Sequence, residues 1–181
     1  MVSIRSWAIL AVLAGSYAWA QPADEKTALA ERFVRAAEQH EQSAMGLRML
    51  ADKLRNEGKI NDAQFACMKK VDGADFLPVM TQIATVQLTA AEMQEAIGFF
   101  ESSGGKKYLQ MSAMKSAEKA GVKPEIEMPD FTPKEYEAVN DFGTTKLYQK
   151  LVNEAVMTRS AAARPLIQAR TMEIMQGCLR R

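Results

Sequence analysis

Core-facing positions recur at alternating steps of four and three residues along the N-terminal part of the chain. The series consists of Phe33, Ala37, His40, Ala44, Leu47, Ala51 and Leu54. A seven-residue period of this kind places one mainly apolar seam along a helix. We therefore expect a single long helix, which ends near Gly58 because glycine readily takes the left-handed conformation of a C-terminal cap.

Two further helices are expected before residue 88. Asn61 or Asp62 can cap a short helix, and Asp75, which follows a turn at Asp72-Gly73, can cap the next one. The apolar residues of these helices are Phe65, Cys67 and Met68 in the first, and Leu77, Met80, Ile83 and Val86 in the second.

Two capping-box sequences, Thr89-x-x-Glu92 and Thr132-x-x-Glu135, mark later helix starts, the second with Pro133 at the favoured first position. A proline-containing loop is expected at 121–130, and a last helix places Ile167, Thr171, Ile174, Met175 and Cys178 on one face. No stretch alternates in the manner of a strand. The chain is therefore expected to be all-α, a single-domain bundle of about six or seven helices without a sheet.

The stretch FFESSGGKK, residues 99–107, separates two amphipathic segments. A phosphate-binding loop needs a preceding strand and a Lys-Ser/Thr pair, which are missing here, so we expect a corner between two helices. Lys106 and Lys107 would oppose the dipole of the second helix, which leaves them free for other contacts. We expect Lys106, Lys107, Phe100 and Tyr108 to be candidate partner-binding residues.

The order leucine-threonine, Glu92, Phe99-Phe100, Ser102 and Gly105-Lys106-Lys107 resembles a family of secreted bacterial proteins. These proteins share a domain of unknown function with the core motif F-Y-x-S-P-x-G-K-K, and the similarity covers about residues 62–114. Phe100 replaces the family's tyrosine, and Ser103 replaces its proline. The resemblance implies a helical periplasmic protein and supplies no catalytic residues.

The N-terminus has the features of a secretory signal peptide. Arg5 precedes an apolar run, and Ala18-Trp19-Ala20 has the small-x-small form of a cleavage site, so cleavage is expected after Ala20. The run is too short to span a bilayer. A helical domain at 21–181 in the periplasm is therefore expected.

Charge argues against two classes of partner. Without residues 1–20 the chain has 22 basic and 22 acidic residues, because Arg5 is the one charged residue removed. A neutral chain without a basic block is unlike proteins that bind nucleic acid or anionic membranes. We expect neither nucleic-acid binding nor membrane insertion after signal removal.

The two cysteines, Cys67 and Cys178, form an even pair. In a periplasm such a pair indicates a disulfide. The alternative is a catalytic thiol, which needs a basic partner to form thiolate.

Other candidate chemistry has a structural alternative in each case. His40, the one imidazole, is a general base or metal ligand, or else a histidine hydrogen-bonded within the helical bundle. Met111/Met114 and Met172/Met175 form copper(I) ligands or core filler. Glu125, Glu127 and Asp130 are a carboxylate group or a solvated loop. We expect no catalytic residues, no cofactor and no metal, and therefore no enzyme.

The two capping-box segments are similar beyond the caps. Thr89, Glu92 and Phe99 correspond to Thr132, Glu135 and Phe142. These matches are explained either by a duplication or by the sequence preferences that helix starts share.

Two functions remain. The first is binding to another protein, in one form as an inhibitor or immunity protein against a periplasm-acting toxic effector. The second is an envelope housekeeping protein, either a chaperone or a carrier of copper or a small ligand, with a pocket near Tyr108 or Tyr148.

Overall fold

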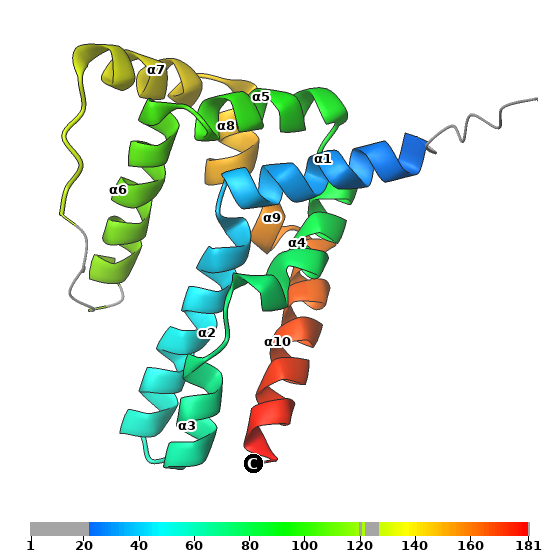
Figure 1. Ribbon diagram of the computed structural model, residues 1–181, viewed down its shortest axis with the longest axis vertical. Coiled ribbons are helices and arrows are strands. Elements are labelled where there is room, and N and C mark those ends of the chain that lie inside the picture. The colour runs from blue at the N-terminus through cyan, green and yellow to red at the C-terminus, as the bar shows by residue number, and fades with distance from the viewer. Residues whose placement is uncertain (1–21, 120, 122–126, 181) are drawn as a thin grey trace, which may run out of the picture.

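The structure is a computed structural model that describes residues 22–119, 121 and 127–180, and these residues form helices and no strand (Figure 1). The predicted all-α class is confirmed. The predicted signal peptide, Pro124 and Glu125 lie outside the described residues. The elements are α1 (Pro22–Ala36), α2 (Gln39–Asn56), α3 (Asp62–Lys69), α4 (Gly73–Gln87), α5 (Ala90–Phe100), α6 (Ser103–Lys119), α7 (Pro133–Gly143), α8 (Lys146–Tyr148), the π-helix η1 (Gln149–Asn153), α9 (Val156–Arg159) and α10 (Ala163–Leu179).

The expected long N-terminal helix is divided into α1 and α2. Glu38 has φ 51° and ψ 25°, a left-handed conformation that ends the first helix and redirects the chain, so that α1 crosses the end of α2 (Figure 1). The seam nevertheless stays on the core side, because Phe33, Ala37, Ala44 and Ala51 are fully buried. Ala155, with φ 50°, separates η1 from α9 in the same way. These breaks give more helical segments than the six or seven expected.

Helix α4 lies at the centre of the fold and packs against α1, α2 and α10. The buried apolar side chains form a continuous cluster, whose largest fully buried members include Phe33, Phe76, Met68, Met80, Ile83, Leu88, Met93 and Met157. Burial of each such side chain contributes about 1.5–3 kcal/mol. Among the helices of the described ranges, none has the length and apolar character that a bilayer span requires.

Most predicted helix ends are found. Thr89 and Thr132 form complete capping boxes, Gly58 has φ 67°, and Asn61 caps α3. The predicted N-cap of α4, Asp75, is wrong by three residues. Asp72 is the cap, and its side chain accepts a hydrogen bond from Ala74 N, while Asp75 is the third helical residue and completes the capping box.

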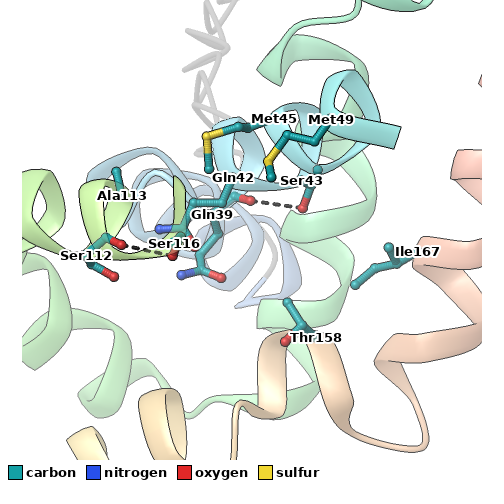
Figure 2. A pocket seen from close by; sticks show the side chains of 11 residues that line it. Gln39, Gln42, Ser43, Met45, Met49, Ser112, Ala113, Ser116, Thr158 and Ile167 are labelled. Carbon is teal, nitrogen blue, oxygen red and sulfur yellow. Dashed lines mark hydrogen bonds between the residues drawn. The ribbon is translucent and has the colours of Figure 1, made fainter. Parts of the chain in front are cut away.

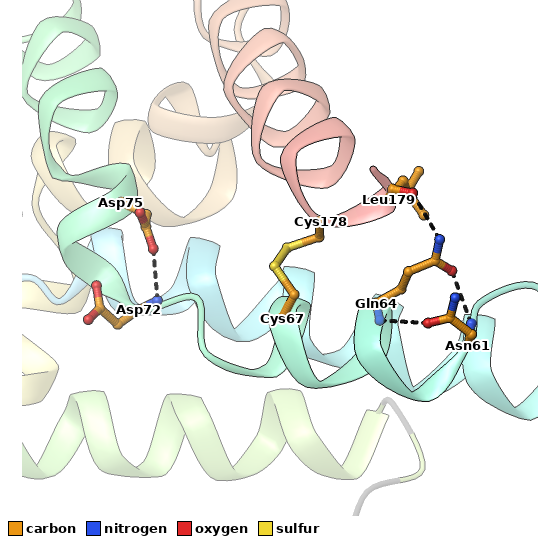
Figure 3. Close-up of a disulfide and its surroundings, with 7 residues drawn as sticks. All are labelled: Asn61, Gln64, Cys67, Asp72, Asp75, Cys178 and Leu179. Carbon is orange, nitrogen blue, oxygen red and sulfur yellow. Dashed lines mark hydrogen bonds between the residues drawn. A yellow bond between two sulfur atoms is a disulfide. The ribbon is translucent and has the colours of Figure 1, made fainter. Parts of the chain in front are cut away.

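A disulfide joins α3 to the last turn of α10 (Figure 3). Cys67 and Cys178 have Cα atoms 5.5 Å apart and are separated by 111 residues in the sequence. Beside it, Gln64 Nε2 donates a hydrogen bond of 2.9 Å to the Leu179 carbonyl. The predicted disulfide is confirmed, and the alternative of a free catalytic thiol is excluded because both cysteines are bonded.

Candidate functional site

The stretch FFESSGGKK is a helix–helix corner, as predicted. Helix α5 ends at Phe100 and α6 begins at Ser103. The Ser102 hydroxyl donates to the Phe99 carbonyl at 2.6 Å and accepts from Gly105 N at 3.0 Å, and so caps α6. A Cβ atom at Gly105 would overlap the carbonyl oxygen of Phe99. The corner therefore requires glycine at position 105 because the backbone approaches too closely for a side chain.

The four residues predicted to contact a partner have different environments in the structure. Phe100 is 4% exposed and belongs to the core, and Lys107 Nζ donates to Glu135 Oε2 at 2.6 Å and to the Asp130 carbonyl at 2.7 Å. These two side chains therefore serve the fold instead of forming a free surface. Lys106 is exposed, and Tyr108 is half-buried.

An aromatic cluster surrounds the corner and consists of Phe99, Phe100, Tyr108, Phe142 and Tyr148. Burial and the neighbouring Tyr148 hydroxyl raise the pKa of the Tyr108 hydroxyl above its usual range. The Tyr108 side chain is therefore a neutral hydrogen-bonding group in this cluster.

A groove runs between α2 and α6, beside η1 and α9. It consists of two adjoining cavities of about 380 and 310 Å³ that share Gln39, Gln42, Ser112, Ser116 and Thr158. Met45, Met49 and Ile167 line the first cavity (Figure 2), whereas Tyr108, Leu151 and Arg159 are among the residues that line the second. We call this site the α2–α6 groove.

Apolar side chains and uncharged polar groups together form most of the groove lining. The Ser43 and Ser116 hydroxyls donate to the carbonyls of Gln39 and Ser112 within their own helices, at 3.0 and 2.9 Å. By contrast, the side-chain amides of Gln39 and Gln42 have no hydrogen-bond partner among the described residues. These two amides are therefore available to a bound molecule, and each offers both a donor and an acceptor.

Arg159 is the charged residue that lines the groove within the described ranges, and no carboxylate of those ranges pairs with it. Its exposed guanidinium can bind a carboxylate through two parallel hydrogen bonds. The thioethers of Met45 and Met49 add flexible apolar contacts. The groove thus suits a largely neutral, hydrogen-bonding molecule that carries one negative charge.

Backbone irregularities gather at the same groove. Glu38 and Ala155 are the non-glycine residues with positive φ in the part of the chain that the structure describes. Glu38 directly precedes Gln39, Ala155 lines the groove, and Leu151 and Val152 of the π-helix line it as well. Strained residues and π-helices are concentrated at functional sites. This coincidence makes the α2–α6 groove the candidate functional site.

The remaining predicted residues lie elsewhere. His40 is half-buried, and its Nδ1 lies 3.2 Å from the Val34 carbonyl, which agrees with the structural interpretation. Met114 is buried, whereas Met172 is 58% exposed. Within the described residues no three His, Cys, Asp or Glu side chains are grouped as metal ligands. Copper(I) binding by the methionines stays an untested alternative.

No protein-family model, curated protein or solved structure matches this chain. The resemblance to a secreted family therefore stays a prediction. The disulfide is compatible with an extracytoplasmic compartment.

Of the candidate residues named from the sequence, Tyr108 and Phe100 line the second cavity of the groove, but its polar residues on α2 and α6 were missed. Gln39, Gln42, Ser43 and Gly46 form a polar and small stripe on α2 beside its apolar seam, and Ser112 and Ser116 form another on α6. Such stripes are also typical of solvated helix faces. Only the tertiary structure shows that the α2 stripe and the α6 stripe face each other across a groove.

Proposed function

We propose that the protein is a binding protein that takes an extended segment of another protein into the α2–α6 groove. The observation that carries this proposal is the pair of unpartnered amides, Gln39 and Gln42, in a groove of otherwise mainly uncharged side chains. An extended main chain presents a donor and an acceptor at nearly every residue. Glutamine amides can satisfy both.

The same lining supports a more specific ligand. Met45 and Met49 can adapt to apolar side chains of different shapes. Arg159 favours a segment with a carboxylate, either an acidic side chain or a chain terminus. The proposed ligand is thus an extended peptide that carries one carboxylate near the Arg159 end of the groove.

The proposed compartment is the periplasm, reached through the predicted signal peptide, and the disulfide supports it. Peptide binding there has two biological forms. An inhibitor or immunity protein has one partner segment, whereas an envelope chaperone binds many. The range of sequences bound distinguishes these forms.

The test is fluorescence anisotropy with labelled ten-residue peptides, with and without one Asp or Glu, and with free or amidated C-termini. Carboxylate-containing peptides should bind more tightly, and Arg159→Ala should weaken their binding about tenfold or more, since a hydrogen bond to a charged group contributes about 1.5–3 kcal/mol. Gln42→Ala should lower the affinity for every peptide that binds.

Arg164→Ala is the matched control, because Arg164 is an exposed arginine of α10 outside the groove. It should leave binding unchanged. Absence of peptide binding by the wild-type protein, or equal losses in both arginine variants, would refute the proposal.

A further inference from the structure

Two segments of the chain correspond without a gap at an offset of 43 residues. Thr89, Glu92, Phe99, Ser102 and Lys107 align with Thr132, Glu135, Phe142, Thr145 and Lys150. The last two pairs extend the sequence similarity past the helix starts. We call residues 89–107 the first unit and residues 132–150 the second unit.

The aligned residues make the same local contacts. In both capping boxes the glutamate accepts from the threonine backbone N, at 2.7 Å in the first unit and 2.8 Å in the second. The Ser102 and Thr145 hydroxyls donate to the carbonyls of Phe99 and Phe142, at 2.6 and 2.8 Å. Each hydroxyl also accepts from the backbone N three residues later, at 3.0 Å in both units.

The contacts between the units are reciprocal. Lys107 of the first unit pairs with Glu135 of the second at 2.6 Å, and Lys150 of the second pairs with Glu92 of the first at 2.7 Å. The Phe99 and Phe142 rings stack on each other. An interface in which residue i contacts j and j contacts i is the signature of twofold symmetry.

These ion pairs are also partly shielded from solvent. The Lys107 and Glu135 side chains are 30% and 13% exposed, and those of Lys150 and Glu92 are 29% and 27% exposed. Of the ion pairs within the described ranges they are the least exposed. Each lysine directly precedes residues that line the groove, since Tyr108 and Leu109 follow Lys107 while Leu151 and Val152 follow Lys150.

We infer that the two units are copies of one duplicated helix-turn-helix element, packed about an approximate twofold axis. We also infer that the two reciprocal lysine–glutamate pairs position the α6 and η1 residues that line the α2–α6 groove. Shared helix-start chemistry explains the threonines and glutamates alone. It does not explain lysines at equal spacing that reach the carboxylate of the other unit. The part that concerns binding rests on the proposed function.

The test is a set of double-mutant cycles on the full chain, using Lys→Met and Glu→Gln. Glutamine can retain the capping box, so Glu→Gln removes the charge and leaves the helix start. Each single variant should raise the unfolding equilibrium constant about threefold to tenfold, because it removes one stabilising ion pair. The between-unit cycles, Lys107 with Glu135 and Lys150 with Glu92, should be non-additive.

The matched controls are the within-unit cycles, Lys107 with Glu92 and Lys150 with Glu135, which should be additive. Lys107→Arg should restore most of the loss of Lys107→Met because it retains the charge. Hydrogen exchange adds a positional readout. Amides near Tyr108 should exchange faster in Lys107→Met, and those near Leu151 in Lys150→Met.

Additive between-unit cycles, or equal coupling within the units, would overturn the inference. Peptide affinity separates it from the proposed function. If the cycles are non-additive and no peptide binds, the reciprocal coupling of the two units stands and the binding proposal fails. If peptides bind and the cycles are additive, binding stands and the inference fails.

Discussion

The ring of Phe99 on α5 stacks on the ring of Phe142 on α7, with centroids 3.8 Å apart and planes 11° from parallel. Phe100 and Tyr148 approach Phe142 edge-on, with centroids 5.7 and 5.8 Å away. The aromatic cluster therefore joins the helices on both sides of the FFESSGGKK corner to the segment that follows α7. Stability of this region should depend on these rings.

Phe142→Ala should destabilise the protein by about 3–5 kcal/mol, because it removes a side chain that is 6% exposed and leaves a cavity. Urea denaturation followed by circular dichroism measures the loss. Tyr136→Ala on the same helix is the control, since Tyr136 is 60% exposed and should change stability little. Similar losses in both variants would contradict the packing described.

Gly105→Ala should destabilise the protein by about 1–3 kcal/mol, because the new Cβ would overlap the Phe99 carbonyl and crowd Phe100. Gly98→Ala is the matched control in α5, where a Cβ meets nothing within 4 Å. It should stabilise the protein by about 0.5–1 kcal/mol, since alanine favours the helix. Thermal denaturation of both variants measures these changes in stability. A neutral Gly105→Ala would show that the corner tolerates a side chain.

Replacement of both Cys67 and Cys178 by serine should lower the free energy of unfolding by up to about 4–5 kcal/mol, because the disulfide closes a loop of more than a hundred residues. Chemical denaturation with and without a reducing agent measures the effect. Reductant should destabilise the wild-type protein and leave the double variant unchanged. Equal stability of reduced and oxidised wild type would exclude a stabilising role for the bond.

Acid should weaken the contact between α6 and α7. Hydrogen bonds from Lys107 and from the Thr132 backbone lower the pKa of Glu135 from 4.5 to about 2. The folded state therefore binds this proton less readily than the unfolded state. The resulting stabilisation is complete above the unfolded pKa and is lost as pH falls from about 5 to 2.

Denaturation from pH 7 to pH 2 tests this expectation. Glu135→Gln should be less stable than wild type at pH 7 and should show a flatter profile between pH 5 and 2. Glu137→Gln, a change at an exposed neighbour on α7, should follow the wild-type profile. Parallel profiles for wild type and Glu135→Gln would mean that the Lys107 pair does not stabilise the fold.

Local signals in the sequence predicted much of the fold. The seven-residue seam, the threonine–glutamate capping boxes and Gly58 all act within a few residues, so their effects are readable along the chain. The disulfide followed from an even pair of cysteines and an inward-facing position for Cys178. The break at Glu38 was missed because a left-handed glutamate has no sequence signal of its own.

The sequence by itself thus determined the helical class, the positions of most helix ends and the pairing of the cysteines. Tertiary structure alone decided that Lys107 pairs with Glu135, that Phe100 is buried, and that Gln39 and Gln42 face Ser112 and Ser116 across a groove. The physical reason is the range of the interactions. Helix caps and periodicity depend on neighbours in the chain, whereas ion pairs and groove walls depend on how distant helices pack.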